Sequence, residues 1–358
     1  MKKFRLILTA MVAIAGFSFV SCNKENEETK NNYTRYQDAV DAQINKQNNE
    51  AILLVAFGST WDQAFDAFDA TIEAYKKAFP KADVYLSYSS AICINRAAAG
   101  ENTKPRNFYA PNFWLHGLGA AKYSTITVQS LQVIPGEEFT RVINYIKDFA
   151  NNSLGDLDDK YLSKVTIKLG LPLLAAKEDV TAAATTLNQL YSAKAAQGVV
   201  AFMGHGNPDS YDTYKANIRY NQLEEELQKF SPNYFVGTVD APDNYKVQVL
   251  ERMQEAGITS GKVYLHPLMS IAGDHAHNDM GGDDGEDMDP AEYEYNDEGE
   301  IEDLSWKCFF SQNGYTCGES ELIMKGLLEV EPIRALWMNH TREAETLEDY
   351  YHSMFPEE

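Results

Sequence analysis

Two segments far apart in this chain share a single pattern, and that pattern restricts the fold more than any other feature. Residues 51–60, AILLVAFGST, and residues 198–207, GVVAFMGHGN, are apolar runs that each end in glycine and polar side chains. A short apolar run that stops at a glycine-containing turn is typical of a strand buried on both faces of a parallel sheet. Apolar side chains at helical spacing follow over residues 61–79 and 220–230 and predict amphipathic helices. Each segment therefore opens a β-α-β unit.

The remaining apolar runs occur in the same order in both parts of the chain, apart from a run at residues 165–174 that adds a strand to the first part. The matched positions are residues 84–90 with 234–241, residues 126–139 with 263–276, Gly58 with Gly204, and Gly136 with Gly273. This order predicts an internal duplication. The fold class that follows is α/β, with two similar Rossmann-like domains, each a small parallel sheet flanked by helices.

We divide the folded region by these runs. Residues 51–187 form the N-terminal α/β domain and residues 188–330 the C-terminal α/β domain, while residues 331–358 form a C-terminal helix that we expect to pack back on the N-terminal domain. An acidic insertion at residues 285–303 interrupts the second domain and contains no Lys or Arg. Because it lacks the ligand order of a calcium loop, we expect a solvated, mobile segment.

The first residues have the composition of a targeting segment. Residues 1–22 consist of a basic start, an apolar stretch and a small residue before Cys22. This order predicts a secretory signal peptide, too short for a stable membrane span, and its end resembles a bacterial lipobox in which Cys22 is lipidated. Residues 23–50 are polar, and we predict that they form a tether. We expect an exported lipoprotein on the periplasmic or cell-surface side, attached to the membrane only through this lipid anchor.

Charge and cysteine content restrict the partners. The formal net charge of −22 disfavours nucleic acid and anionic membrane surfaces, because phosphates are repelled, and favours cations. The other cysteines, Cys93, Cys308 and Cys317, lack the spacing of a zinc knuckle or CxxC motif. Whether Cys308 and Cys317 form a disulfide stays open, as does a homo-oligomer.

The ends of the strands carry the candidate site. Ligands of such sheets bind at the carboxyl ends of the strands, so a cleft between the domains presents His205, Asp240 and His275 from three successive strand ends. His277 lies two residues beyond His275 and points to the other side if the chain is extended, so we do not expect it to be a direct ligand. We expect His116, His266, His340 and His352 to be structural or surface residues.

Two imidazoles and one carboxylate suit a divalent ion such as Fe²⁺, Co²⁺ or Ni²⁺, with coordination positions left open for exchange. Histidine also accepts protons near neutral pH. No GxGxxG, Walker or GxSxG element stands at a strand-turn-helix position. This absence argues against binding of dinucleotides or ATP and against the α/β-hydrolase mechanism.

Several blocks between Ala51 and Arg342 together resemble one family. They are LLVAFGST, VQSLQVIPGEEF, LGLPLL, VAFMGHG, VGTVDA, HPLMSIAGDHAHNDM, DDG and SWK. The chain is similar to the anaerobic sirohydrochlorin cobaltochelatases of the CbiK type, class II chelatases related in fold to protoporphyrin ferrochelatase. The resemblance implies a lyase that inserts Co²⁺ into a tetrapyrrole without ATP or another nucleotide, in a cleft between two α/β domains.

The resemblance also implies roles for individual residues. The metal-side histidines of the family correspond to His205 in GHG and His275 in AGDHA, and the family's glutamate corresponds to Asp240, which is one methylene shorter. Gln132 stands where the family often has a histidine that some exported relatives associate with haem binding. The substrate carboxylates require donors, and the nearest candidates by loop position are Arg96, Arg219, Lys246 and Lys307.

Three functions fit these observations. The leading hypothesis is an exported chelatase that inserts Co²⁺, or Fe²⁺, into a tetrapyrrole such as sirohydrochlorin. The alternative is an extracytoplasmic protein on the same fold that binds haem, a corrinoid or a divalent metal, or removes the metal. Asp240, Gln132, the tether and the acidic insertion motivate this alternative. A protein-interaction module on a decayed enzyme fold is the third hypothesis.

Overall fold

The computed structural model describes residues 27–101, 104–212, 214–297 and 299–347. The expected signal peptide and Cys22 lie outside these residues, as does His352. Within them, no helix is both long and apolar enough to cross a membrane.

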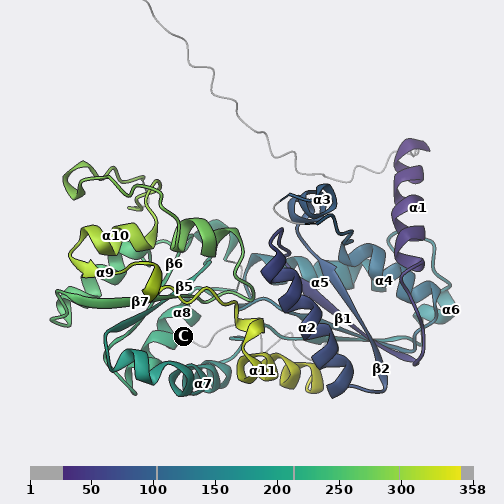
Figure 1. Ribbon diagram of the computed structural model, residues 1–358. Helices are drawn as coiled ribbons and strands as arrows, with labels where there is room; N and C mark the ends of the chain where they lie inside the picture. The colour runs from purple at the N-terminus through teal and green to yellow at the C-terminus, as the bar shows by residue number, and fades with distance from the viewer. Residues whose placement is uncertain (1–26, 102–103, 213, 298, 348–358) are drawn as a thin grey trace, which may run out of the picture.

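Two separate parallel sheets form the framework of the molecule (Figure 1). The first has the order β2-β1-β3-β4 and the second the order β6-β5-β7-β8. The strands are β1 Glu50–Ala56, β2 Ala82–Tyr88, β3 Thr125–Ser130, β4 Thr166–Gly170, β5 Val199–Gly204, β6 Tyr234–Thr238, β7 Gly261–Pro267 and β8 Tyr315–Thr316. All pairings between these eight strands are parallel. The predicted fold class, two similar α/β domains, is confirmed.

Helices flank both sheets. They are α1 Glu27–Asp41, α2 Asp62–Ala78, α3 Ala91–Ala99, α4 Pro111–Ala120, α5 Glu137–Ala150, α6 Asp159–Leu162, α7 Lys177–Ala195, α8 Ile218–Gln228, α9 Lys246–Glu255, α10 Trp306–Gln312 and α11 Glu331–Arg342. In α2, Phe65, Phe68 and Tyr75 are buried against the sheet, as the helical spacing predicts. Leu53 and Leu54 of β1 are completely buried, and each such side chain contributes about 1.5–3 kcal/mol to folding.

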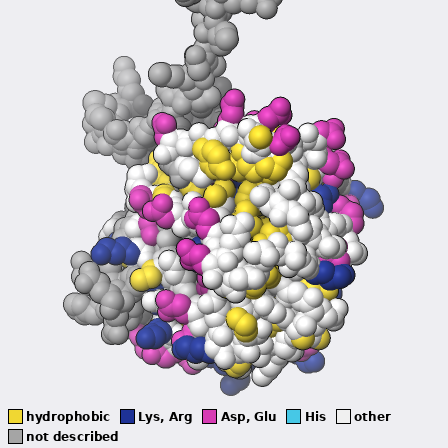
Figure 2. All heavy atoms as spheres, turned by 90° about the vertical axis from the view of Figure 1, so that its left-hand side faces the viewer, with side chains coloured by type: hydrophobic (Ala, Val, Ile, Leu, Met, Phe, Trp, Pro, Cys, Tyr) yellow, Lys and Arg dark blue, Asp and Glu magenta, His cyan; other side chains and the backbone are white. Residues whose placement is uncertain are grey.

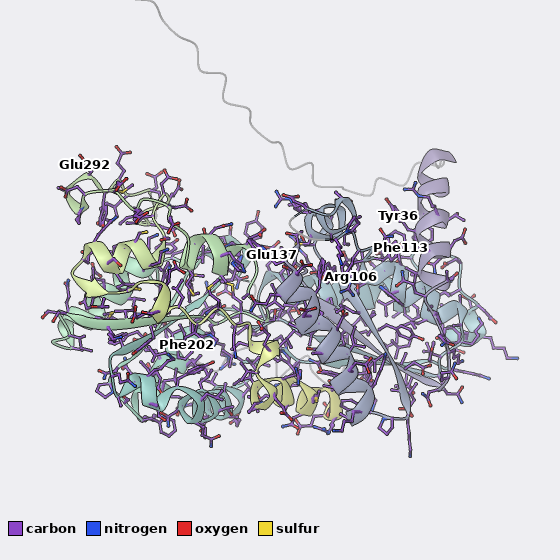
Figure 3. All side chains as sticks on the ribbon, in the orientation of Figure 1. Tyr36, Arg106, Phe113, Glu137, Phe202 and Glu292 are labelled. Carbon is purple, nitrogen blue, oxygen red and sulfur yellow. The ribbon has the colours of Figure 1, made fainter. Side chains whose placement is uncertain are left out.

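The predicted polar tether is wrong for the part of residues 23–50 that the structure describes. Residues Glu27–Asp41 form helix α1, which packs on α4. Tyr36 contacts Phe113 of α4 with 5.4 Å between ring centroids (Figure 3). Val40 is completely buried. Tyr33, Tyr36 and Val40 recur at helical spacing, so one face of an otherwise polar segment is apolar enough to dock.

The C-terminal helix α11 contacts the N-terminal sheet and α7. Trp337 donates from Nε1 to the carbonyl of Gln132 at 3.1 Å, and Thr341 donates to Gln129 at 2.7 Å. The boundary that we placed after residue 187 falls inside α7, a single helix that leads from the first sheet to the second.

The acidic insertion is anchored at its C-terminal end instead of being solvated throughout. Lys246 donates to the carbonyl of Ile301 at 2.5 Å, and both Ile301 and Leu304 are buried. Figure 2 shows Asp and Glu side chains along the upper rim of this end of the molecule. Immediately after the insertion, Ser305 caps α10 by accepting from the amide of Cys308. Cys308 and Cys317 are free thiols.

Matching backbone hydrogen bonds hold the strand ends of the two halves in one arrangement. The equivalent bonds are Leu131 N to Val55 O and Leu268 N to Met203 O, then Ser90 N to Phe57 O and Asp240 N to His205 O. Phe57 is therefore the counterpart of His205, and Ser90 is the counterpart of Asp240.

The same comparison corrects the predicted pairing of Gly58 with Gly204. Gly58 follows Phe57, and Gly206 follows His205, so these two glycines are equivalent. Both have positive φ, 119° and 84°, a conformation that favours glycine. The pairing predicted from the sequence was off by two residues. Gly204 is the last residue of β5, and the glycine of the turn comes two residues later.

Candidate functional site

A cleft with a volume of about 350 Å³ lies between the two halves, at the carboxyl ends of their strands. Its walls include Phe57, Glu137 and Glu138 from the first half and His205, Asp240 and His275 from the second. Figure 3 shows Glu137 at the centre of the molecule, between the two sheets. The expected position of the site, between the domains at strand ends, agrees with this cleft.

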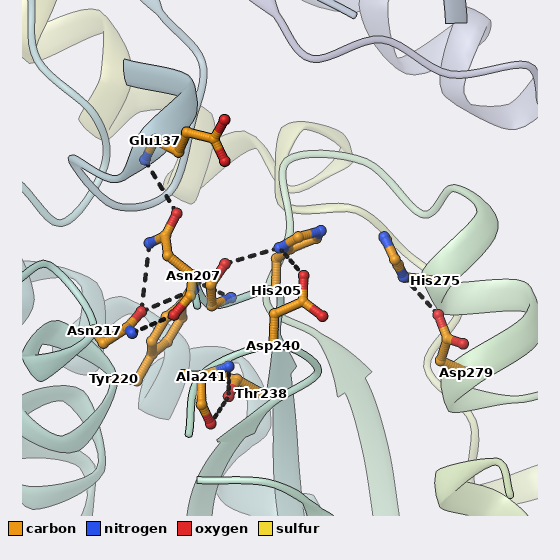
Figure 4. Close-up of polar contacts among 11 residues, drawn as sticks. Glu137, His205, Asn207, Asn217, Tyr220, Thr238, Asp240, Ala241, His275 and Asp279 are labelled. Carbon is orange, nitrogen blue, oxygen red and sulfur yellow. Dashed lines mark hydrogen bonds and ion pairs between the residues drawn. The ribbon is translucent and has the colours of Figure 1, made fainter. Parts of the chain in front are cut away.

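The turn after β5 sets the position of His205. Gly206 requires the absence of a side chain, because a Cβ atom there would lie 2.6 Å from the amide nitrogen of Ala241. The carbonyl of His205 accepts from the amide of Asp240 at 2.7 Å, which places this aspartate beside the histidine. Nδ1 of His205 donates to the carbonyl of Gly206 at 2.8 Å and lies 3.4 Å from Oδ2 of Asp240 (Figure 4). In the neutral ring, Nε2 therefore keeps its lone pair.

His275 reaches the cleft from the residues after β7, immediately before the π-helical turn Ala276–Met280. Its Nδ1 is 2.5 Å from Oδ2 of Asp279, so this ring too is oriented by a carboxylate and leaves Nε2 available. The centroids of the His205 and His275 rings are 4.7 Å apart at an angle of 86°. The two imidazoles point toward one another in Figure 4.

The predicted trio is thus brought together, although not as a closed ligand set. Asp240 faces the Nδ1 edge of His205, away from the edge that faces His275 (Figure 4). Across the described part of the chain, no three His, Cys, Asp or Glu side chains are arranged to hold a metal ion together. Metal binding by all three residues would therefore require Asp240 to turn.

The two imidazoles differ in basicity. His205 is half exposed, but the surrounding walls of the cleft partly desolvate its ring, and this desolvation, with the charge of His275, lowers the pKa of His205. Asp240 offsets only part of this effect. Burial also opposes protonation of His275, but the hydrogen bond and charge of Asp279, with Asp240, outweigh it and raise the pKa of His275. Near neutral pH the site therefore favours a neutral His205 beside a more basic His275.

The opposite wall of the cleft carries carboxylates. Glu137 and Glu138 begin α5, where the helix dipole favours negative charge. Ser89 donates to Oε2 of Glu138 at 3.0 Å, and burial raises the pKa of this carboxyl group. The amide of Glu137 donates to Oδ1 of Asn207 at 3.1 Å, a direct bond between the two halves (Figure 4).

His277 has a role that the sequence did not indicate. Its ring stacks on Trp61 of the other half, with centroids 3.8 Å apart and an angle of 11° between planes. Nε1 of Trp61 donates to Oδ1 of Asp274 at 2.5 Å. His277 thus contributes to the contact between the halves. No local signal identifies Trp61, whereas Asp279, four residues after His275, could have been found from helical spacing.

The predicted donors for substrate carboxylates do not line the cleft. Arg219 is buried and donates to the carbonyl of Ala175, and Lys246 is held by Ile301. Lys307 contacts Asp283 and Glu319 at 2.6 and 2.7 Å, and Arg96 lies 3.3 Å from Glu101. Position in a loop was a poor guide, because these long side chains turn toward nearby carbonyls and carboxylates.

The other described histidines are structural, as expected. His116 contacts Asp156 at 2.7 Å, and His340 lies 3.5 Å from Asp179. His266 is completely buried within β7, where its Nε2 contacts the hydroxyl of Tyr191 at 2.7 Å.

Comparisons with known proteins point to one family. Residues 50–346 match the family described as cobalt chelatase (CbiK). The sirohydrochlorin cobaltochelatase CbiKC of Nitratidesulfovibrio vulgaris (strain Hildenborough) is 27% identical over 292 residues, 81% of this chain and 89% of the relative. The sirohydrochlorin cobaltochelatase of Salmonella typhimurium (strain LT2) is 26% identical over 301 residues, 82% of this chain and 96% of the relative.

Among solved structures, SirB from Bacillus subtilis with Fe³⁺ is 14% identical with a TM-score of 0.49, over 86% of this chain and 99% of that chain. The sirohydrochlorin chelatase SirB from Bacillus subtilis subspecies spizizenii in complex with cobalt is 13% identical with a TM-score of 0.48, over 82% of this chain and 94% of that chain.

Proposed function

This chain belongs to the cobalt chelatase (CbiK) family, and from that premise we propose that it inserts a divalent metal ion, Co²⁺ or Fe²⁺, into a tetrapyrrole such as sirohydrochlorin without ATP. The observation that carries the proposal is the pair of imidazoles, His205 and His275, that point toward one another in the cleft. Both relatives described above are named as sirohydrochlorin cobaltochelatases, which supports the choice of substrate.

The reaction exchanges one metal ion for two pyrrole protons, and the residues of the cleft can handle both. The Nε2 atoms of His205 and His275 can bind the incoming ion in place of water, because their Nδ1 atoms are occupied by hydrogen bonds. When an imidazole takes up a pyrrole proton, Asp240 or Asp279 stabilises the resulting charge. The apolar walls suit the faces of a flat macrocycle, and Phe57 and Ile271 belong to them.

The chelatase proposal is tested by following the absorption spectrum of sirohydrochlorin with Co²⁺ and the full chain. We expect acceleration over the spontaneous reaction that is lost in His205→Gln, with the melting temperature of the variant recorded to exclude unfolding. His340→Gln, which removes an imidazole outside the cleft, is the matched control and should retain activity. No acceleration by the wild-type chain would reject the proposal.

We also propose export as a lipoprotein anchored through Cys22, on the order of residues at the start of the chain. Metabolic labelling with a radioactive fatty acid tests this directly. Label should enter the wild-type protein in a host that processes lipoproteins and be absent from Cys22→Ser. Label in neither protein would reject the lipid anchor.

The alternative function, extracytoplasmic binding of haem, a corrinoid or a metal, or removal of the metal, is favoured by Asp240. This aspartate engages Nδ1 of His205 instead of completing a metal site. Tight binding of a metallated tetrapyrrole, without insertion into the metal-free form, would favour this alternative over the chelatase.

A further inference from the structure

The outer strands β2 and β6 occupy equivalent places in the two sheets, and each has one edge that none of the eight described strands covers. An uncovered edge presents unpaired backbone N–H and C=O groups, which can bind another extended chain. Leu86 lies four residues before Ser90, as Val236 lies before Asp240, so Leu86 of β2 is the counterpart of Val236 of β6. The two halves differ at this position.

Side chains seal the edge of β6. The amide of Val236 donates to Oε2 of Glu224 at 2.6 Å, and its carbonyl accepts from Arg252 at 2.9 Å. Glu224 and Arg252 also pair with each other, with 2.9 Å between Oε1 and Nε. Two residues further along, the amide of Thr238 donates to the carbonyl of Asn244. This part of the edge is therefore closed to another chain.

The edge of β2 lacks the seal. The amide of Tyr88 donates outward to the carbonyl of Tyr109, whereas the amide of Ser89 donates to the last residue of β1. Because backbone groups alternate in direction along a strand, the N–H and C=O groups of Val84 and Leu86 also face away from β1. Within the part of the chain that the structure describes, no residue bonds to these outward groups of Val84 and Leu86.

A groove with a volume of about 650 Å³ lies along this open edge. Its lining includes residues 82–86 of β2, with Ile72 and Lys76 of α2 and Trp114 of α4. Helix α2 packs on one face of the first sheet and α4 on the other, so the groove has a wall on each side. This shape suits a single extended chain better than the edge of a second copy, which would bring its own helices against the same walls.

The carboxylate that lines the groove is already engaged. Asp83 accepts from the amides of Gln47 and Asn48 at 2.8 and 3.0 Å, and from the hydroxyl of Tyr123 at 2.7 Å. These donors satisfy its charge within the protein, so Asp83 is not left to attract a cationic ligand.

The cations that line the groove, Lys76 and Arg106, have partners that a ligand can replace. Lys76 lies 2.8 Å from Glu73, and Arg106 lies 2.9 Å from Asp69. Both pairs stand in solvent, where an ion pair contributes little to stability. A carboxylate brought along the groove can therefore bind either cation at little cost.

We infer that the open edge of β2 binds an extended peptide with acidic side chains, which joins the first sheet as an added outer strand. The main chain of the peptide pairs with the outward groups of Val84 and Leu86, and its carboxylates bind Lys76 and Arg106. The inference does not rest on the proposed function, since the groove and the cleft share no lining residue.

The probe is a fluorescently labelled synthetic peptide of about seven residues, the length of an ordinary strand, in which valine and glutamate alternate. Its binding to the full chain is measured by fluorescence anisotropy, and we expect saturable binding. Methylation of alternate backbone nitrogen atoms, in one of the two possible registers, should weaken binding by about tenfold or more, because it removes donors and blocks pairing. Glutamine in place of glutamate should weaken it several-fold.

Two variants of the protein locate the binding. Val84→Pro removes an outward amide, and an edge strand tolerates proline where the N–H does not pair with its neighbour, so binding should weaken by about tenfold. The melting temperature of this variant is recorded alongside. Lys76→Gln leaves the backbone intact and should weaken binding several-fold, which keeps the test decisive if Val84→Pro does not fold. Lys164→Gln removes the same charge from an exposed position outside the groove and, as the matched control, should bind like the wild type.

Absence of binding by the wild-type chain would overturn the inference. So would equal binding of both N-methylated peptides, because the main chain would then not be recognised, and equal binding of the glutamine peptide would overturn the acidic preference. A wild-type dimer that Val84→Pro converts to a monomer would assign the open edge to a second copy of this chain and would also overturn the inference. The chelatase proposal is tested in the cleft and stands or falls independently of these results.

Discussion

The two halves of the molecule share a backbone arrangement and differ in the side chains that stand at its equivalent positions. Phe57 and Ser90 in the first half occupy the places of His205 and Asp240 in the second. Glu138 lies the same number of residues after Leu131 as His275 lies after Leu268, so these two residues also correspond. Imidazoles therefore occur in only one copy of the arrangement, and the other copy supplies an aromatic ring and acid groups. The scaffold fixes where side chains stand, and the residue types decide what each wall does.

Replacing both histidines should break this asymmetry most severely. His205→Ala with His275→Ala removes the groups that can bind the ion and accept protons, so we expect the rate of Co²⁺ insertion into sirohydrochlorin to fall by about 10²–10⁴-fold. Phe57→Ala alters the counterpart of His205 and should lower the rate by less than about tenfold, because it removes only contact area. Equal losses in the two proteins would show that the imidazoles have no special role.

The two halves can also be compared through the effect of the buried His266 of β7 on the free energy of unfolding. Its counterpart is Gln129 of β3, which is likewise completely buried. Burial lowers the pKa of His266 to about 4, so its contribution to stability is full above the ordinary value of 6.5 and is lost as the pH falls toward 4. The loss amounts to about 3 kcal/mol over this range, at about 1.4 kcal/mol per pH unit.

His266→Gln copies the residue of the first half and should remove that pH dependence. Urea denaturation at several pH values between 4 and 7 measures it. The free energy of unfolding of the variant should decline less steeply on acidification than that of the wild type. Parallel curves would contradict the assignment of a neutral imidazole at this position.

Substitution of the equivalent glycines, Gly58 and Gly206, compares the backbone turns of the two halves. Gly58→Ala and Gly206→Ala both place a side chain at positive φ, and each should lower the free energy of unfolding by about 1–3 kcal/mol. Only the second should also displace a residue of the proposed metal site, since the new Cβ would meet the amide of Ala241 beside Asp240. We therefore expect a larger loss of insertion rate, at temperatures where both proteins are folded, in Gly206→Ala. An equal loss would count against the coupling of this turn to His205.

Asp240→Ser places in the second half the residue type that the first half has at the equivalent position, Ser90. Because Asp240 lies 3.4 Å from Nδ1 of His205, its removal should lower the insertion rate by about tenfold and further lower the pKa of the ring. The pKa of His205 is measurable by NMR titration of the imidazole protons. Asp240→Glu, which lengthens the side chain, should retain the charge and most of the activity. An unshifted His205 titration in Asp240→Ser would show that this carboxylate does not act on the ring.

The sequence was sufficient for the repeated framework. Strands β1 and β5 could be predicted from apolar runs, and α2 from apolar residues at helical spacing. Burial imposes these patterns on the local sequence. The rule that strand ends meet at one edge of a sheet was enough to group His205, Asp240 and His275.

Contacts between distant side chains could not be predicted in this way. The stacking of Trp61 on His277 joins segments from opposite halves, and no local pattern encodes it. The inward orientation of Arg219, which donates to the carbonyl of Ala175, depends equally on packing. Helix α1 was missed because only one narrow face of it is apolar, and a tally of polar residues hides such a face.

The stacked pair of Trp61 and His277 gives the molecule an optical signal of its own. Trp61 crosses from one half to the other, bonded to Asp274 and covered by an imidazole, while Trp114, Trp306 and Trp337 are buried. Because the indole of Trp61 stacks on the imidazole of His277, we expect its fluorescence to change if the two halves separate and expose it to water. Emission lost on replacing Trp61 by Phe would isolate this signal. The opening of the cleft for a large flat ligand could then be timed in solution without an added label.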